Sequence, residues 1–464
     1  MIFETMEQLR KGLEGILAID GDDVKVLDEA KLRASLIDDL IYTAVFSPRQ
    51  DVMEAASWLI RRSGAAVDVI SASIQTLYEA MGRNEVTGFT VPAINIRAFT
   101  YHFARAVLQA AMKGRVGAVI FEIARSEIDY TEQRPAEFTA AVTAAAIKTG
   151  YRGPLFIQGD HFQVNAKKYA ADPLKEVNAV KDLIWEAIDA GFYNIDVDTS
   201  TLVDLNKPTV KEQQTLNYSL AAELTTVIRD LEPAGVTISV GGEIGEVGGK
   251  NSTVEELCAF MEGYGEELRK SGENLIGISK MSVQTGTTHG GVPLADGTVA
   301  KVKLDFQTLE KLSEAARTGY GLSGAVQHGA STLPKEAFDR FPAIGTAEIH
   351  LATGFQNIIY DSPNLPEALR AQIYDYLRSR LAAERKETDT DEQFLYKTRK
   401  KGFGPFKKEM WHLPPEILTA LGRELENQFS FLYEKLNVNN TADIVQRYIK
   451  PVIVPLKKPA ALLF

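Results

Sequence analysis

The chain has 464 residues and a formal net charge of −11, and its 45% hydrophobic and 24% charged residues are typical of a soluble globular protein with one large or two to three smaller domains. The acidic balance argues against a nucleic-acid partner, and without a signal-peptide pattern or an apolar stretch of about 20 residues we expect no membrane association. The single cysteine, Cys258, excludes an intramolecular disulfide framework and favours a cytoplasmic location.

Residues 1–86 are predicted to form a helical extension. Apolar residues recur at helical spacing over residues 27–43, 52–62 and 67–81, with a break at Ser47-Pro48. The segment contains no histidine and no glycine-rich loop. We therefore expect it to serve packing or oligomerisation rather than to form a separate binding module.

Residues 87–364 are predicted to form a (β/α)8 barrel, because eight apolar runs alternate with helical segments. A doubly wound sheet is the alternative. The barrel is favoured because polar, glycine-rich sequence follows nearly every strand, where barrel enzymes place their catalytic residues. The predicted strands are residues 89–96, 118–123, 154–157, 194–197, 236–240, 275–279, 322–326 and 344–351, and the helices are 99–112, 136–148, 175–190, 214–231, 254–269 and 306–316.

Three of the six histidines follow predicted strands and stand beside Asp or Gly: His161, His289 and His328. The carboxyl ends of barrel strands meet at one face, and imidazole is the commonest zinc ligand. The set therefore predicts one metal site, although a lone histidine beside glycine is more often structural. The other polar residues at strand ends include Asn95, Arg125, Asp160, Asp198, Glu243, Ser331, His350 and Thr353.

These strand ends, taken in order, resemble the signature blocks of the class II, zinc-dependent fructose-bisphosphate aldolases and their tagatose-bisphosphate relatives. The resemblance covers residues 88 to about 360 and leaves both extensions unexplained. The blocks are Val-Pro-Ala-Ile-Asn95, Gly-Asp160-His161, Ile-Asp-Val-Asp198-Thr-Ser200, Glu243-Ile-Gly-Glu-Val-Gly-Gly249, Gly-Thr-Thr-His289-Gly290 and His328-Gly-Ala-Ser331.

The resemblance implies that His161, His289 and His328 bind Zn²⁺. Three neutral imidazoles leave zinc its full charge and an open position, and a Lewis acid on a ketone oxygen stabilises the enediolate that aldol cleavage requires. Asp160 matches the acid/base at the C4 hydroxyl, with a carboxylate that orients an imidazole as the alternative. Glu243 and Asp198 match acidic positions that contact a second mono- or divalent cation or hold the ligands by hydrogen bonds.

The resemblance also implies a phosphate site built from loop backbone and hydroxyl groups. Glycines allow the close backbone approach that such a site needs. The matching residues are Gly249, Gly290, Gly329, Ser331 and Thr353, and Asn95 is expected to contact the substrate.

The chain departs from the family pattern at three places. Lys250-Asn251 stands where the family has an acidic pair that includes a catalytic base, so Glu246 is the first candidate replacement, followed by Glu255 and Glu256. At strand eight, His350-Leu-Ala-Thr replaces Asn-x-Asp-Thr, and at strand two Ala-Arg125 stands where the family has Ser. Arg125 and His350 could therefore meet a different substrate end, since arginine binds phosphate, sulfonate or carboxylate through two donors. A packed strand-end imidazole is the equal alternative for His350.

Residues 365–464 are predicted to form a mainly helical extension with a final helix over residues 440–449. Its segment 397–408 has six basic residues in twelve. A solvated loop is the simple interpretation, and closure over a phosphate site, in the same or a neighbouring subunit, is the alternative. His102 and His412 lack a ligand pattern and are expected to be structural.

The resemblance implies a homo-oligomeric lyase that reversibly cleaves a ketose (bis)phosphate to dihydroxyacetone phosphate and an aldehyde. Fructose 1,6-bisphosphate is the leading substrate, followed by tagatose bisphosphate or another modified ketose phosphate. Two further hypotheses stay open. One is a metal-dependent sugar-phosphate isomerase or epimerase, and the other is a non-catalytic barrel subunit retained for assembly.

Overall fold

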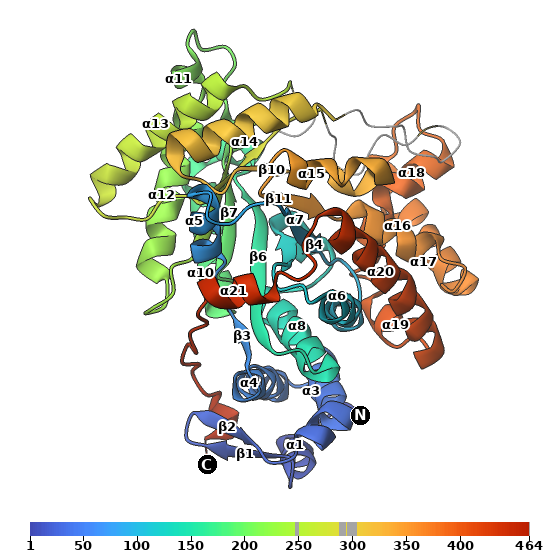
Figure 1. Cartoon of the computed structure of the whole chain (residues 1–464). Coiled ribbons are helices and arrows are strands. Elements are labelled where there is room, and N and C mark those ends of the chain that lie inside the picture. Colours follow the sequence, from blue (N-terminus) through green and yellow to red (C-terminus); the bar gives the residue numbers. More distant parts are fainter. Residues whose placement is uncertain (246–249, 287–293, 295–303, 464) are drawn as a thin grey trace.

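The computed structural model describes residues 1–245, 250–286, 294 and 304–463. At its centre eight parallel strands form a closed barrel surrounded by helices (Figure 1). The ring closes because β4 pairs with both β5 and β11 while β6 pairs with β7, which excludes an open doubly wound sheet. The (β/α)8 prediction is confirmed. The strands are β4 (Val91–Asn95), β5 (Ile120–Ala124), β6 (Gly153–Gln163), β7 (Asn194–Asp198), β8 (Ser239–Glu243), β9 (Lys280–Val283), β10 (Ala325–Gln327) and β11 (Glu348–Leu351).

The helices around the barrel begin and end at the local signals that the sequence carries. Thr253 and Glu256 form a reciprocal capping box at the start of α13, and Pro135 occupies the first turn of α8. All six predicted helices are confirmed within a few residues. The helices are α6 (Thr100–Gly114), α7 (Arg125–Tyr130), α8 (Pro135–Thr149), α9 (Ala166–Ala171), α10 (Pro173–Asp189), α11 (Val210–Gln213), α12 (Thr215–Leu231), α13 (Val254–Ser271), α14 (Phe306–Tyr320), α15 (Arg340–Ala343) and α16 (Thr353–Asp361).

Several strands extend beyond, or lie after, the apolar runs that predicted them. The predicted strand 154–157 continues to Gln163, and the run 275–279 only precedes β9, which begins at Lys280. β8 likewise begins and ends later in the chain than the predicted strand 236–240, and it includes Gly241-Gly242. A Cβ at Gly241 would lie 2.3 Å from Asp196 Oδ1, so glycine is required where charged side chains crowd the barrel interior. Apolar periodicity missed these strand ends because their inward residues are polar.

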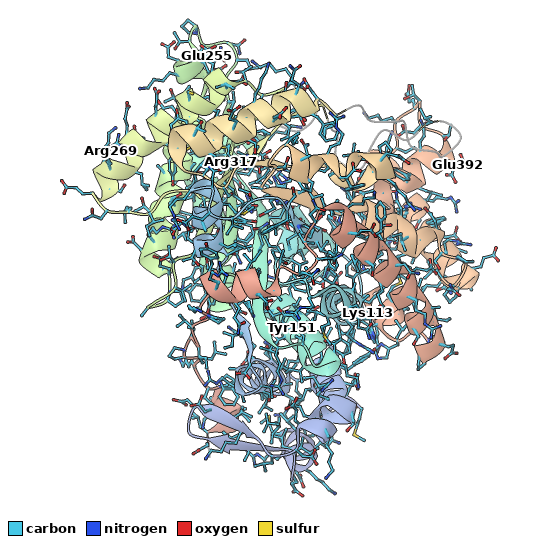
Figure 2. The ribbon with its side chains drawn as sticks, in the orientation of Figure 1. Lys113, Tyr151, Glu255, Arg269, Arg317 and Glu392 are labelled. Atoms are coloured by element: carbon cyan, nitrogen blue, oxygen red, sulfur yellow. The ribbon has the colours of Figure 1, made fainter. Side chains whose placement is uncertain are left out.

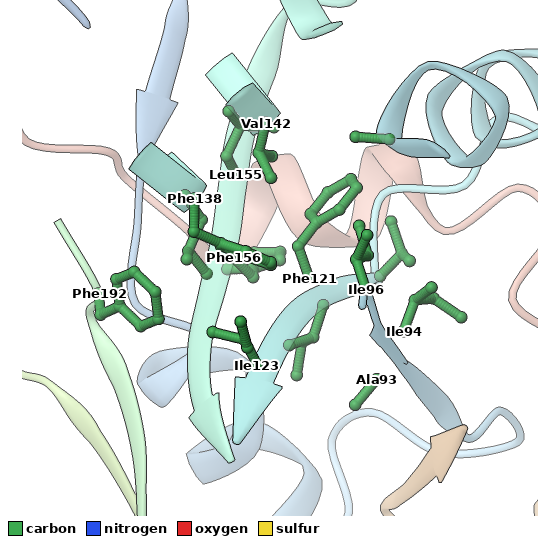
Figure 3. Packing of buried hydrophobic residues seen from close by; sticks show 14 of the residues in the cluster. Ala93, Ile94, Ile96, Phe121, Ile123, Phe138, Val142, Leu155, Phe156 and Phe192 are labelled. Carbon is green, nitrogen blue, oxygen red and sulfur yellow. The ribbon is translucent and has the colours of Figure 1, made fainter. Parts of the chain in front are cut away.

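The apolar residues of the first strands face outward, toward the helices. Figure 3 shows Phe156 of β6 next to Phe138 of α8, with Phe121 of β5 and Val142 of α8 in the same cluster, and all four side chains are buried. Successive strand residues point to opposite faces, so the neighbour of Phe121, Glu122, points into the barrel. The interior is thus left to polar and charged side chains.

The N-terminal extension is mainly helical, but the prediction that it is wholly helical is wrong. A hairpin joins β1 (Leu17–Asp20) to β2 (Asp23–Val26) through Gly21-Asp22, where Gly21 has φ +61° and suits a two-residue turn. Within the predicted helix 67–81, β3 (Val69–Ser71) instead pairs with the start of β6. The helices are α1 (Met6–Leu13), α2 (Glu29–Lys31), α3 (Ile37–Phe46), α4 (Gln50–Ala66) and α5 (Gln75–Gly82).

The C-terminal extension packs on the barrel, with α20 lying against α6. The predicted final helix is confirmed. The tail after it packs against the body, where Trp58 Nε1 donates to Leu456 O at 3.4 Å. One continuous core links the extensions to the barrel, and the boundaries at 86 and 364 stay predictions. None of the described helices is long and apolar enough to cross a bilayer. The helices are α17 (Glu367–Arg380), α18 (Asp391–Thr398), α19 (Lys407–Trp411), α20 (Pro415–Lys435) and α21 (Ala442–Tyr448).

Candidate metal centre

A cavity of about 540 Å³ opens at the carboxyl ends of β4, β5, β6, β10 and β11. Most of the predicted site residues that the structure describes line it together, although they come from five strands and loops. Glu246, Gly249, His289 and Gly290 lie outside the described residues. The predicted residues in the lining are Asn95, Arg125, Asp160, His161, His328, Gly329, Ser331, His350 and Thr353.

Three imidazoles are gathered at the floor of this cavity. The ring centroid of His328 lies 4.2 Å from that of His161 and 4.1 Å from that of His350. Asp160 Oδ1 lies between them, 3.4 Å from His328 Nε2, 3.2 Å from His350 Nδ1 and 3.8 Å from His161 Nε2. One carboxylate oxygen is thus shared by three rings.

A bulge in β6 makes this arrangement possible. Consecutive strand residues normally point to opposite faces, yet Asp160 and His161 both reach the cavity. The pairing of β6 with β7 shifts register between Gly159 and Phe162, and His161 has φ +41°, in the left-handed region. The irregular backbone therefore re-aims His161 beside Asp160.

Asp198 and Glu243 contact the far nitrogen of His161. His161 Nδ1 donates to Asp198 Oδ2 at 2.9 Å and lies 3.2 Å from Glu243 Oε2. A carboxylate on one ring nitrogen fixes the tautomer and leaves the other nitrogen for a metal. This geometry favours the predicted hydrogen-bonding role, while the ligand atoms of the three residues are also close enough to hold a cation.

Beneath the histidines lies a buried charge network that the sequence prediction did not include. Lys280 Nζ is 2.6 Å from Glu348 Oε1 and 3.0 Å from Asp196 Oδ1, and it also donates to Gln158 Oε1 at 2.7 Å. Tyr78 donates to the other oxygen of Glu348. A signal was present, because Glu122, Lys280 and Glu348 are charged residues within or beside apolar strands.

The electrostatics keep the donor groups in different protonation states. Burial opposes ionisation of Asp160, but His161 and His350 outweigh it and hold the pKa of this carboxyl well below its usual range. Burial, with His350 and His161 nearby, lowers the pKa of His328 well below its ordinary value. For Asp160 and His328 this is the protonation state that metal binding requires. Burial opposes protonation of His161 and His350, but the carboxylates beside them outweigh it and raise the pKa of both rings, so a metal would displace a proton from each.

The donor set fits a metal ion. Asp160 Oδ1 and His350 Nδ1 are buried and make no hydrogen bond. Two ligands of one tetrahedral zinc, each about 2.0–2.2 Å from it, lie about 3.3–3.5 Å apart. The 3.4 Å between Asp160 Oδ1 and His328 Nε2 matches that spacing.

Two loops at the seventh and eighth barrel strands form a cradle beside the histidines. Gly329 has φ +69° and begins the turn Ala330–Thr332, while α16 begins at Thr353. Ser331 Oγ accepts from Gly354 N at 3.1 Å and joins the two loops. Barrel enzymes frequently bind phosphate at these strands, where backbone N–H groups and a helix N-terminus converge.

Neither of the outer candidates for the missing base fits the site. Lys250 Nζ pairs with Glu256 Oε1 at 2.8 Å, and Glu256 also caps α13. Glu255 is exposed and lies at the edge of the molecule in Figure 2. Neither glutamate is in the cavity lining, so Glu246, in the segment that is not described, stays the first candidate.

The basic segment 397–408 is folded rather than a solvated loop, and its residues have separate roles. Arg399 is buried and pairs with Asp361 Oδ1 at 2.6 Å, and Lys401 pairs with Glu384 at 2.7 Å. Lys400 lines the cavity of its own chain, as does Lys397, which also pairs with Asp389. These two lysines reach the cavity from within one chain, and closure over a phosphate site stays a prediction.

Arg125, which departs from the family pattern at strand two, is paired with groups of the protein itself. Arg125 Nη1 lies 2.6 Å from Glu176 Oε1 and also donates to the backbone oxygen of Gln163. Arg97 forms a second such pair, with its Nη2 2.7 Å from Glu127 Oε1. Both arginines line the cavity with their charges already paired.

Comparison with known proteins agrees with the fold and identifies the family. The family model for class II fructose-bisphosphate aldolase matches residues 75–410, which extends past the sequence blocks and includes the basic segment. A Sinorhizobium meliloti structure described as a probable tagatose 6-phosphate kinase is 19% identical, with a TM-score of 0.52, over 80% of this chain and 96% of its own.

Two further solved structures are more distant. A Campylobacter jejuni fructose-bisphosphate aldolase is 16% identical, with a TM-score of 0.47, over 80% of this chain and 97% of its own. An aldolase from Escherichia coli K12 is 14% identical, with a TM-score of 0.44, over 80% and 100% of the two chains. No curated protein sequence matches the chain. On the family match, which spans well over half of its length, the chain belongs to the class II fructose-bisphosphate aldolase family.

Proposed function

We propose that the protein is a zinc-dependent aldolase that reversibly cleaves a ketose phosphate, with fructose 1,6-bisphosphate as the leading substrate. The observation that supports this most is the clustering of Asp160, His161 and His328 at the mouth of a barrel of this family. His289 is the proposed third imidazole ligand, by resemblance. Bound zinc would supply Lewis-acid stabilisation of the enediolate that forms when the carbon–carbon bond breaks.

Asp160 is the proposed proton carrier at the substrate hydroxyl. It lines the cavity, it is ionised at neutral pH, and it lies within reach of any group held between His161 and His328. In the cleavage direction the carboxylate accepts the hydroxyl proton, and in the synthetic direction it returns it. Asp198 and Glu243 orient His161, and burial with Asp198 nearby raises the pKa of Glu243 to about 7.

The two ends of the substrate would meet different parts of the chain. The loop at Gly329–Ser331 and the N-terminus of α16 are the proposed site of the phosphate on the ketone half. Lys400 is the proposed contact for a second anionic group, because it lines the same cavity from the C-terminal extension. Burial, followed by the charge of Arg97, lowers the pKa of Lys400, and an anion beside this ammonium would relieve that repulsion.

Lys400→Met tests the second contact against Lys401→Met, a matched change in a lysine that pairs with Glu384 and does not line the cavity. The Lys400 variant should raise KM for a bisphosphate about tenfold, the value of one exposed charge-assisted contact, and raise KM for the corresponding monophosphate less. Equal effects of the two variants on both substrates would exclude Lys400 from the substrate site.

The activity itself is tested by enzymatic detection of triose phosphate. Metal-free protein reloaded with zinc would be mixed with fructose 1,6-bisphosphate, tagatose 1,6-bisphosphate and fructose 1-phosphate, with a chelated sample as the control. Chelator-sensitive release of two trioses is the expected result. Isomerised hexose without triose would establish the isomerase or epimerase instead. No conversion of any ketose phosphate by the zinc-loaded protein would favour a non-catalytic subunit.

A further inference from the structure

His350 has an environment that a packed strand-end imidazole does not need. Its Nε2 donates to Glu348 Oε1 at 2.6 Å, and its Nδ1 lies 3.1 Å from Glu122 Oε2 and 3.2 Å from Asp160 Oδ1. Yet Nδ1 makes no hydrogen bond to either oxygen, although the ring is only 4% exposed. The nitrogen is therefore held between two carboxylates without the geometry of a donor.

The arrangement around His350 repeats that around His161. In each ring one nitrogen donates to a buried carboxylate, Asp198 for His161 and Glu348 for His350, while the other nitrogen points to Asp160 Oδ1. A carboxylate behind the imidazole is the usual companion of a metal-bound histidine. Glu348 is itself held by Lys280, Gln158 and Tyr78, so its position is fixed by three donors.

The buried carboxylates around His350 also favour a bound cation. Glu122, Asp160, Asp196 and Glu348 are all buried, and among the described residues Lys280 is the single ammonium in contact with them. Buried charges that are left unbalanced are costly, and metal coordination is one way in which proteins balance them. Glu122 Oε1 also makes no hydrogen bond. The donor atoms of Glu122, Asp160 and His350 lie within 4.8 Å of one another.

We propose that the barrel mouth holds two divalent cations that share Asp160, one beside His161 and His328 and a second bound by Glu122 and His350. The second site uses the residue at strand eight that departs from the family pattern. The ligand spacings of 3.1 Å and 3.2 Å are those of donors about 2.0–2.2 Å from one metal with angles near 90–105°. Carboxylate-bridged pairs of this kind hold their ions roughly 3.5–4 Å apart.

The second cation deepens the proposed function, because it lies beside the carboxylate that would carry the substrate proton. With Asp160 bridging two ions, its second oxygen is the one left for the substrate. The rival explanation for His350 is an imidazolium that neutralises the carboxylates without a metal. The two explanations differ in the number of ions bound per chain.

Metal counting tests the proposal directly. Metal-free wild-type protein would be reloaded with Zn²⁺, desalted and analysed for zinc per chain by mass spectrometry. We expect two zinc ions in the wild type and one in both His350→Asn and Glu122→Gln, with folding checked by circular dichroism. His102→Asn, the same change in a buried histidine outside the cavity, should keep two.

Manganese binding tests the distance between the two proposed ions. Reloaded with Mn²⁺, the wild type should give an exchange-coupled paramagnetic resonance spectrum, and His350→Asn should give the six-line spectrum of an isolated ion. One zinc in the wild type, or two uncoupled manganese ions, would overturn the second site. If one zinc supports triose release, the aldolase stands without the second site. If two coupled ions bind and no ketose phosphate is cleaved, the site stands and the function falls.

Discussion

The histidines in the described part of the chain form two groups with opposite surroundings. His161, His328 and His350 lie among buried carboxylates at the barrel mouth. His102 and His412 lie among the aromatic rings of α3, α6 and α19, where His102 Nε2 is 2.9 Å from Tyr42 Oη. A carboxylate bound to one imidazole nitrogen leaves the other nitrogen available to a metal. An imidazole that contacts hydroxyl groups and aromatic rings instead contributes to packing. The neighbours of a histidine, more than its burial, indicate its role.

Removing one histidine from each group should separate their roles most strongly. His328→Asn should lose the bound metal and lower kcat/KM by about 10³-fold or more, because metal stabilisation of developing charge is worth several kcal/mol. His102→Asn should keep both metal and turnover. Metal analysis and the triose assay on the two variants provide the check, and equal losses would contradict the division into two groups.

The charges beneath the first group should matter for folding. Lys280→Met leaves Glu348 and Asp196 buried without their ammonium, and should lower the free energy of unfolding by about 3–5 kcal/mol. Lys25→Met, which removes an exposed ion pair with Asp20, should change it little. Urea denaturation of the metal-free proteins measures the free energy of unfolding of both variants. An unchanged free energy in Lys280→Met would show that other groups neutralise the two carboxylates.

The carboxylate behind His161 should affect metal affinity more than folding. Asp198→Asn keeps the shape but weakens the hold on His161 Nδ1, so zinc should bind about 10–100-fold more weakly. Asp129→Asn is the matched control, because Asp129 lines the cavity but is 82% exposed and pairs loosely with Arg134. Competition with a zinc chelator gives the two affinities. Unchanged zinc binding in the Asp198 variant would remove its orienting role.

The second group should show its character in acid. Burial, followed by the charge of Arg105, lowers the pKa of His102 to about 3. Below pH about 6.5 the imidazole of His102 becomes protonated in the unfolded chain but stays neutral in the folded chain. The free energy of unfolding should therefore fall from that pH toward pH 3, with a slope of up to about 1.4 kcal/mol per pH unit. His102→Phe should flatten this slope in denaturation series, and an unchanged slope would mean that the ring titrates normally.

The sequence predicted the barrel, the helices and the residues that gather around Asp160, because strand ends carry polar residues at regular intervals. It could not predict that Asp160 and His161 both face the cavity, since that depends on a bulge within β6. It also missed Lys280 and Glu122, because inward-facing charges break the apolar periodicity that marks a strand. Lys400 lines the cavity because the C-terminal extension packs on the barrel, and no local sequence pattern shows this long-range packing.

The most direct test of the metal centre is anomalous diffraction at the zinc edge from crystals of the reloaded protein. A peak about 2.0–2.2 Å from His161 Nε2, His328 Nε2 and Asp160 is the predicted result. Zinc bound only elsewhere on the protein, with these three side chains uncoordinated, would contradict the account.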